Sequence, residues 1–307
     1  MELIRGIHNI RPEHRRCVLT IGNFDGVHLG HRAILSRVKE LAAEYGSPTG
    51  IIIFEPQPRE FFSPDTAPGR LGRLRDKVKL LEGQGIDYVL CMPFNLKFQQ
   101  LDAQAFCEKV LQSGLDVAHL VVGDDFRFGC DRQGDFDYLT SFGIRNGFKV
   151  ERTPSVKNPL GDRVSSTLVR GLLEKGDLVS AKENMGHPIT LDGRVIHGQK
   201  LGRKLGFPTA NIHLKGIKSA LSGVYAVTLE EKGVIYKGVA NIGVRPTVKG
   251  KTPILEVHLF DFNGDLYDSY VQVTFCHFIR AEKKMAGLDA LEKQIQHDKE
   301  EAIRFFD

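Results

Sequence analysis

The stretch Thr20–His31, "TIGNFDGVHLGH", marks the passage from a buried strand into a helix. It follows the apolar run Cys17–Ile21 and places three glycines, one acid and two histidines where a helical pattern begins. From Ile34 to Tyr45, apolar residues recur at spacings of four, three and four, which places them on one helix face. The stretch therefore predicts a strand–turn–helix unit, the first step of an α/β fold.

Strand-like and helical patterns alternate along the first 185 residues. The candidate strands are the short apolar runs 17–22, 50–54, 87–92, 117–123 and 148–153. Further helical spacing occurs over Leu74–Leu81 and Phe106–Leu111, and Asp102 can cap the second of these helices. This alternation predicts a doubly wound, mostly parallel sheet that is covered on both faces. Active sites in such folds lie at the carboxyl ends of the strands.

The pattern changes near residue 186 to close-set, β-rich runs. These runs are 189–198, 223–230, 234–243, 253–262 and 270–279, with turn signals at 231–233 and 263–265. Such a series favours an antiparallel barrel or sandwich. The spacing of apolar residues over Leu288–Ile303 predicts a C-terminal helix. We therefore predict two domains, residues 1–186 and 187–307.

Composition narrows the class of protein. The net charge of +4 is small and dispersed, which argues against nucleic-acid binding and favours an anionic small ligand. The five cysteines are far apart and form no Cys-x-x-Cys pair, as expected of reduced thiols in a cytosolic protein. The first residues lack the apolar core of a signal peptide, and no run approaches the roughly 18 apolar residues of a membrane span. We expect a cytoplasmic protein without a membrane partner.

The turn at Gly22–His31 predicts a phosphate site. Its glycines allow close approach of a ligand, and the helix that follows presents free N–H groups to the loop. His28 and His31 could donate hydrogen bonds to a phosphate during attack at phosphorus. Zinc is disfavoured, because helical zinc sites place histidines at i and i+4 with a glutamate beside the first. A third interpretation gives the two histidines no role.

Three other segments should support this site. Val122–Gly129, "VGDDFRFG", follows the fourth predicted strand and brings acids and aromatics to the same sheet edge. Arg163–Arg170, "RVSSTLVR", places hydroxyls and arginines at the opening of a helix, a second phosphate-binding arrangement. Phe54–Phe62, "FEPQPREFF", offers aromatic rings on which a flat ligand could stack. Ordinary core packing is an equal alternative for any single phenylalanine.

The segment "HGQKLGRKLGFPTANI", residues 197–212, predicts a second nucleotide site. Glycines recur there at every fourth residue among basic side chains, as in a flexible loop over phosphates. Thr209 and Asn211 carry oxygens of the kind that Mg²⁺ accepts beside nucleotide phosphates. A plain turn between two strands is the alternative, and the residues alone leave the two interpretations in balance.

Strand alternation in "PILEVHLFDF", residues 253–262, isolates one carboxylate. Leu255, Val257 and Leu259 share one face, so Glu256 lies on the other with His258 and Phe260. A carboxylate in this position either faces water or takes a proton from a substrate hydroxyl. Without further information the solvated position is the simpler interpretation.

Together these motifs resemble those of the bifunctional bacterial riboflavin kinase and FMN adenylyltransferase family, the prokaryotic FAD synthetases. The first half carries the G-x-F-D-G-x-H-x-G-H, V-G-x-[DN]-F-x-F-G and S-S-T-x-x-R patterns, and the second carries "GFPTAN", "SGVYAV", "GVANIGVRPT" and "LEVHLFDF". The resemblance implies an N-terminal doubly wound parallel-sheet nucleotidyltransferase domain. It also implies a C-terminal antiparallel β-barrel kinase domain with a C-terminal helix.

The resemblance further implies two reactions with ATP, Mg²⁺ and flavins. The second domain would phosphorylate riboflavin to FMN, with Glu256 as the base and Mg²⁺ held by Thr209 and Asn211. The first would adenylylate FMN to FAD and release pyrophosphate, with His28 and His31 as catalytic residues. Flavins and ATP would be the only partners implied, and the oligomeric state stays open.

Binding residues follow from the same resemblance. ATP is expected in the first domain at Gly22, Asn23, Phe24, Asp25, Gly26, Gly30, Arg163, Ser165, Ser166, Thr167 and Arg170. The flavin is expected there at Phe54, Pro56, Pro58, Phe62, Asp125, Phe126 and Phe128. In the kinase domain ATP is expected at Gly198, Gly202, Gly206, Thr209 and Asn211. The flavin is expected at Arg280, in a segment where Met285 replaces the usual phenylalanine.

Overall fold

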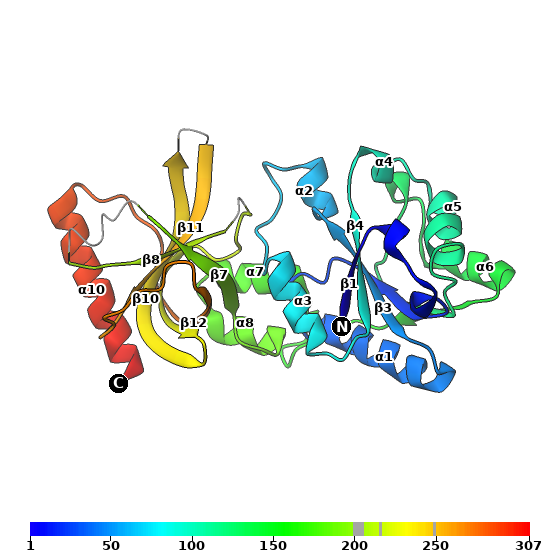
Figure 1. Ribbon diagram of the computed structural model, residues 1–307, viewed down its shortest axis with the longest axis horizontal. Helices are drawn as coiled ribbons and strands as arrows, with labels where there is room; N and C mark the ends of the chain where they lie inside the picture. The colour runs from blue at the N-terminus through cyan, green and yellow to red at the C-terminus, as the bar shows by residue number, and fades with distance from the viewer. Residues whose placement is uncertain (199–205, 215–216, 248–249) are drawn as a thin grey trace. The chain divides into compact units, whose positions relative to one another are not determined.

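The computed structural model describes residues 1–198, 206–214, 217–247 and 250–307, with side chains described outside 244–252. The chain forms two compact units (Figure 1). The first consists of Met1–Pro68 and Lys77–Ser165, and the second of Gly69–Asp76 and Ser166–Asp307. Among the described residues, no helix is both long and apolar enough to cross a membrane.

The first unit contains a six-stranded sheet in the order β1-β4-β3-β2-β5-β6, and every neighbouring pair is parallel. The strands are β1 (Glu2–Arg5), β2 (Val18–Ile21), β3 (Thr49–Glu55), β4 (Tyr88–Pro93), β5 (His119–Gly123) and β6 (Lys149–Thr153). The parallel sheet predicted from the sequence is therefore confirmed. Strand β1 was not predicted, because this short edge strand buries only Ile4 and so has no apolar pattern.

Helices cover both faces of this sheet. Val18 and Val121 pack against Val38 and Leu41 of α1 (Leu29–Tyr45) on one face. On the other face Leu19 and its neighbours pack against α5 (Ala103–Phe106), the π-helical turn η3 (Cys107–Gln112) and α6 (Phe136–Asn146). The remaining helical segments are α2 (Pro58–Phe62), α3 (Leu74–Glu82), α4 (Leu96–Gln99), η1 (Ile7–Asn9), η2 (Pro12–His14) and η4 (Cys130–Arg132).

One predicted helix has an unexpected form. The carboxylate of Asp102 accepts a hydrogen bond from the backbone N–H of Ala105 at 2.7 Å, so the predicted cap is confirmed. The helix then changes to π geometry at Cys107. Apolar spacing alone did not predict this change, because Phe106, Val110 and Leu111 are buried in either helix type.

The second unit is built on a closed antiparallel barrel with the strand order β10-β11-β8-β7-β12-β9. Its strands are β7 (Thr190–Ile196), β8 (Ala210–His213), β9 (Gly223–Glu231), β10 (Val234–Thr247), β11 (Gly250–Leu259) and β12 (Tyr270–Arg280). Closure decides between the barrel and the sandwich that the sequence left open. The hairpin between β9 and β10 turns through Lys232 and Gly233, both with positive φ.

Helices also contribute to the part of the second unit that the structure describes. Helix α7 (Ser166–Glu174) contributes Val169 and Leu173 to the barrel core, and α8 (Leu178–Met185) contributes Ala181. The predicted C-terminal helix is confirmed as α10 (Leu288–Phe306), which lies alongside the barrel in Figure 1. Ala302 of α10 packs on the β9 and β10 side chains of a smaller apolar cluster. This helix therefore forms one wall over the barrel surface.

Candidate active sites

The sheet order places the histidine loop at the topological switch point of the parallel sheet. Strand β2 pairs with β3 on one side and with β5 on the other, so the chain changes direction across the sheet between β2 and β5. Ligands of open α/β sheets bind at the carboxyl ends of the strands at such a switch point. Gly22 directly follows β2 and Asp124 directly follows β5. The structure thus brings together two of the predicted motifs.

The loop after β2 has a constrained backbone. Phe24, Gly26 and Val27 all adopt positive φ, at 46°, 80° and 43°. For residues other than glycine this region costs about 1–2 kcal/mol each. Phe24 and Val27 are almost completely buried, and the buried ammonium of Lys77 donates a hydrogen bond to the Asn23 carbonyl. Burial and this bond hold the loop against its backbone strain.

The two histidines stack at the start of α1. Their ring centroids lie 3.6 Å apart and the ring planes differ by 20°. His28 is the N-cap residue, and its Nδ1 accepts a hydrogen bond from the backbone N–H of His31 at 3.3 Å. A neutral His28 ring therefore carries its proton on Nε2. The pair combines an imidazole donor with the positive end of a helix dipole, which suits a phosphate.

Gly30 is closely packed against His28. A Cβ atom at this position would lie 3.0 Å from the Val164 carbonyl oxygen and 3.1 Å from Cε1 of His28. These distances are tighter than nine in ten real Cβ contacts, so a larger residue would require the imidazole or the carbonyl to shift by a few tenths of an ångström. The glycine in the His-Leu-Gly-His motif therefore sets the position of the first histidine.

Charges at the end of β5 compensate one another. The Arg163 guanidinium lies 3.0 Å from a carboxylate oxygen of Asp124 and 3.0 Å from one of Asp125. The hydrogen bond with Asp125 is the main reason that the pKa of Arg163 lies above its ordinary value. An anionic ligand at Arg163 must therefore compete with two carboxylates. Asp25, also predicted at the nucleotide site, is buried.

The aromatic side chains predicted to stack on the flavin have several environments. Phe128 is buried in the hydrophobic core, and Phe54 and Phe126 pack against that core from its edge. Phe62 is 62% exposed and lies 5.5 Å from the Phe94 ring. Of the two prolines, Pro56 is exposed and Pro58 opens α2. Phe62 and Pro56 thus have the most solvent-accessible surface in this group.

The predicted "SST" phosphate motif is divided between the two units. Ser165 ends the first unit, whereas Ser166, Thr167 and Arg170 belong to the second and lie on α7. Nε of Arg170 donates a hydrogen bond to the Gly69 carbonyl at 2.6 Å, within the second unit. The boundary between the two compact units therefore passes between Ser165 and Ser166.

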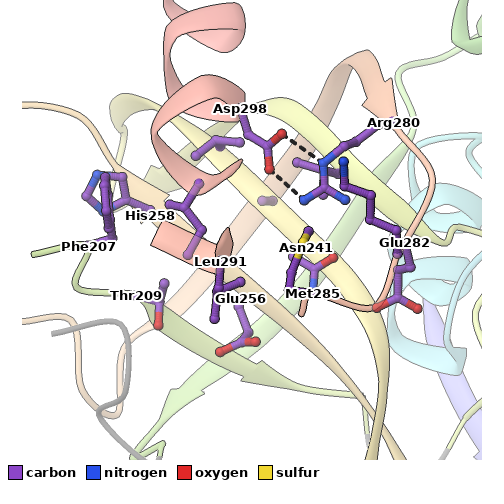
Figure 2. Close-up of a pocket in the computed structure, with 15 residues that line it drawn as sticks. Phe207, Thr209, Asn241, Glu256, His258, Arg280, Glu282, Met285, Leu291 and Asp298 are labelled. Carbon is purple, nitrogen blue, oxygen red and sulfur yellow. Dashed lines mark hydrogen bonds and ion pairs between the residues drawn. The ribbon is translucent and has the colours of Figure 1, made fainter. Parts of the chain in front are cut away.

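The second unit contains a cavity of about 270 Å³ between the barrel and α10. Figure 2 shows Glu256, Thr209 and Asn241 among its lining side chains. The lining residues are Phe207, Thr209, Val224, Val239, Ala240, Asn241, Glu256, His258, Arg280, Glu282, Lys283, Met285, Leu291, Ile295 and Asp298. The predicted strand faces are confirmed, because Leu255, Val257 and Leu259 are buried in the barrel core.

Two asparagines flank Glu256 across the sheet. Asn211 of β8 and Asn241 of β10 both pair with Glu256 of β11 in the strand register. Directly opposed residues on neighbouring strands point to the same face. The carboxylate therefore belongs to a polar row that crosses three strands, with Thr209 just before β8. Sequence patterning did not single out Asn241, because strand register is set by long-range pairing.

The Asn211 carboxamide is held in a narrow space. Its Nδ2 donates to the Thr209 carbonyl oxygen at 3.1 Å. A Cβ atom on Gly198 would lie only 2.5 Å from the same Nδ2, so a larger residue would force the carboxamide to shift. Oδ1 of Asn211 is buried and accepts no hydrogen bond from the described residues. Gly206 has open surroundings and φ of 82°, and Gly202 lies outside the described residues.

The guanidinium of Arg280 forms a bidentate ion pair on the cavity wall. Its Nε and Nη2 lie 2.8 and 2.7 Å from the two carboxylate oxygens of Asp298 on α10, drawn as dashed lines in Figure 2. Gln294 also donates to Asp298 at 2.8 Å. Arg280 lines the cavity, and its charge is compensated by Asp298, a partner that the sequence did not predict.

Comparison with known proteins identifies the family. Residues 10–168 match the family model for FAD synthetase, and residues 185–306 match that for riboflavin kinase. The chain is 53% identical over 299 residues to the bifunctional riboflavin kinase/FMN adenylyltransferase of Pseudomonas fluorescens, covering 97% of this chain and 96% of that protein. The chain belongs to the bifunctional riboflavin kinase/FMN adenylyltransferase family. The Escherichia coli K12 member is 48% identical, with coverage of 100% and 98%.

A solved structure has the same fold. The crystal structure of a macrolide-efflux protein from Streptococcus pneumoniae aligns with a TM-score of 0.79 and 27% identity, covering 99% of each chain. Family membership confirms the resemblance that the sequence motifs indicated.

Proposed function

We propose that this chain makes FAD from riboflavin in two ATP-dependent steps. Residues 187–307 phosphorylate riboflavin to FMN, and residues 1–186 adenylylate FMN with release of pyrophosphate. Family membership supports both reactions. The observation that carries the proposal is that each unit has its own polar site: the stacked His28 and His31 in the first, and Glu256 on the cavity wall in the second.

In the kinase reaction a carboxylate activates an alcohol. Glu256 takes the proton from the terminal ribityl hydroxyl as that oxygen attacks the γ-phosphorus of ATP. The bond from the γ-phosphorus to the β,γ-bridging oxygen breaks, and ADP leaves. Asn211 and Asn241 lie directly opposite Glu256 in the strand register.

Thr209 and Asn211 would hold Mg²⁺ in the kinase domain. The Asn211 carboxamide oxygen fits this role, because it is buried, accepts no hydrogen bond from the described residues, and is a hard donor. The Thr209 hydroxyl lies 3.5 Å from Nδ2 of the same carboxamide, so the two side chains are neighbours. Mg²⁺ bound there would neutralise phosphate charge. Gly198, Gly202 and Gly206 would border the ATP phosphates, and Arg280 would contact the flavin.

In the adenylyltransferase reaction an FMN phosphate oxygen attacks the α-phosphorus of ATP. The bond between the α-phosphorus and the α,β-bridging oxygen breaks, and pyrophosphate leaves without a covalent enzyme intermediate. Nε2–H of His28 and the N-terminus of α1 stabilise the negative charge that develops on the phosphoryl oxygens. His31 supports the His28 ring by stacking and contributes a second imidazole. Ser166, Thr167 and Arg170 would bind phosphate, as their motif predicts.

The remaining ligand contacts follow the motifs. The ATP of this reaction would lie over Gly22–Gly26 and beside Arg163, and the flavin against the aromatic side chains that follow β3 and β5. These small-molecule partners suit a cytoplasmic enzyme without nucleic-acid or membrane partners.

Product analysis tests the proposal directly. Purified protein is incubated with riboflavin, ATP and Mg²⁺, and in a second reaction with FMN in place of riboflavin. Chromatography should show FMN and then FAD in the first reaction, and FAD alone in the second. If the protein forms FMN but no FAD, it is a kinase alone. If it converts FMN to FAD but does not phosphorylate riboflavin, it is an adenylyltransferase alone. Flavin binding without turnover would indicate a regulatory protein.

A further inference from the structure

His258 lies two residues beyond Glu256 on the same face of β11 and lines the same cavity. Its side chain is nearly buried, at 8% exposure. Figure 2 shows its ring next to Phe207, and the ring centroids are 5.5 Å apart at 80°. The imidazole therefore contacts the segment that leads into Thr209.

One hydrogen bond defines the protonation of this ring. Nδ1 of His258 lies 2.9 Å from the backbone carbonyl oxygen of Pro208. A carbonyl oxygen only accepts, so Nδ1 carries a proton and donates it. Burial lowers the pKa of His258, and the carbonyl contact only partly offsets that effect. The residue is therefore a neutral imidazole with a single N–H, directed at the backbone of the "GFPTAN" segment.

The other ring nitrogen makes the choice of histidine costly. Nε2 is buried and has no hydrogen-bond partner among the residues that the structure describes. A buried acceptor without a partner costs free energy of folding, so an apolar side chain of similar shape would be more favourable here. Among the described residues, the hydrogen bond that this ring makes is therefore the one from Nδ1–H to the Pro208 carbonyl.

We propose that His258 is a positioning residue for the kinase reaction. Its bond to the Pro208 carbonyl holds the segment 207–209, and this segment places the Thr209 hydroxyl beside the Asn211 carboxamide. Glu256 and His258 lie on one strand, so β11 sets both the base and the oxygens that would hold Mg²⁺ with ATP. This inference rests on the proposed kinase activity. It adds the residue that aligns the metal-binding oxygens with the base.

Matched variants separate the two ring nitrogens. In His258→Asn the carboxamide nitrogen lies close to the place of Nδ1 and can still donate to the Pro208 carbonyl. In His258→Gln the amide lies near the place of Nε2, and in His258→Leu the donor is lost. Formation of FMN is measured at varied Mg·ATP and at varied riboflavin, and thermal unfolding is recorded. Formation of FAD from supplied FMN is the control within the same chain.

Loss of one hydrogen bond corresponds to about a tenfold change. We expect His258→Gln and His258→Leu to raise the KM for Mg·ATP about tenfold, with the KM for riboflavin and FAD formation from FMN unchanged. His258→Asn should restore most of the affinity. The comparison of Asn with Gln remains decisive if the leucine variant fails to fold.

Other results would overturn the proposal. Wild-type kinetics for the glutamine variant, with impairment of the asparagine variant, would indicate a direct ligand contact through Nε2. Equal kinetics for all variants, with only the unfolding temperature lowered, would indicate core packing. A raised KM for riboflavin alone would place the residue at the flavin. Absence of FMN formation by the wild-type protein would refute the kinase activity itself and the inference with it.

Discussion

Replacement of Gly198 by alanine should selectively impair the kinase. The added methyl group would lie 2.5 Å from Nδ2 and 2.6 Å from Oδ1 of Asn211, whereas ordinary contacts begin near 3.4 Å. The carboxamide would therefore have to move by about 1 Å, the kind of misplacement that can cost about 10²-fold in rate. That factor corresponds to about 2.7 kcal/mol in the activation barrier. Gly198 does not have positive φ, so alanine introduces little backbone strain of its own.

The assay measures kcat/KM for Mg·ATP in the formation of FMN, together with the Mg²⁺ concentration needed for half-maximal rate. For Gly198→Ala, kcat/KM should fall and the Mg²⁺ concentration for half-maximal rate should rise, while the formation of FAD from FMN is unchanged. Gly83→Ala is a matched control, because its methyl group would have its nearest contact at 3.5 Å, with the Leu80 carbonyl oxygen. A Gly198→Ala enzyme with wild-type kcat/KM and Mg²⁺ dependence would refute the assignment of Asn211 as a metal ligand.

Three further outcomes can be tested. His28→Ala should abolish FAD formation with FMN formation intact, and Glu256→Ala should do the reverse when FMN is supplied; chromatography of products decides, and parallel loss of both activities would contradict two independent sites. Asp298→Asn removes the charge that compensates the Arg280 guanidinium, and breaking such a buried pair costs roughly 3 kcal/mol, so the unfolding temperature should fall; an unchanged temperature would contradict this. Burial lowers the pKa of His119 below its ordinary value of 6.5, so the protein should lose stability as the pH falls from 6.5 toward the folded-state pKa. In thermal melts at several pH values, a His119→Leu variant should lose less unfolding temperature over this range than the wild-type protein. An identical pH dependence of the unfolding temperature in both proteins would refute the effect.

The predictable part of the fold depended on local patterns. The buried strands of the parallel sheet are continuous apolar runs, and Asp102 is a recognisable cap, so these elements were visible in the sequence. Strand β8 was not predicted, because Ala210–His213 is short and is held in place by pairing with β7 and β11. Such pairing joins residues far apart in the chain, and local propensity does not report it.

The sites likewise combine residues that the sequence predicts with partners that it does not. The motif residues were predictable because functional residues of α/β folds lie at the ends of strands, but the residues that support them were not. Lys77 reaches the Asn23 carbonyl across 54 residues of chain. The partner of Arg280 can be recognised in the sequence pattern. Asp298 shares a helix face with Leu291, Ile295 and Ala302, and a lone carboxylate on an apolar stripe indicates a buried partner.

The glycines of the two motifs have different structural roles, and the sequence pattern alone does not distinguish these roles. Spacing at every fourth residue suggested one flexible loop over phosphates. Gly198, however, lies so close to the Asn211 carboxamide that a Cβ atom would displace it, whereas Gly206 has open surroundings and a positive φ. Gly30 resembles Gly198 to a lesser degree, because a methyl group there would lie 3.0 Å from the Val164 carbonyl oxygen and 3.1 Å from the His28 ring. In each unit a glycine therefore acts by letting the backbone approach a functional side chain and limit its position. Since a side chain already confined in the free protein loses less entropy when substrate binds, these two contacts favour preorganised sites over flexible loops.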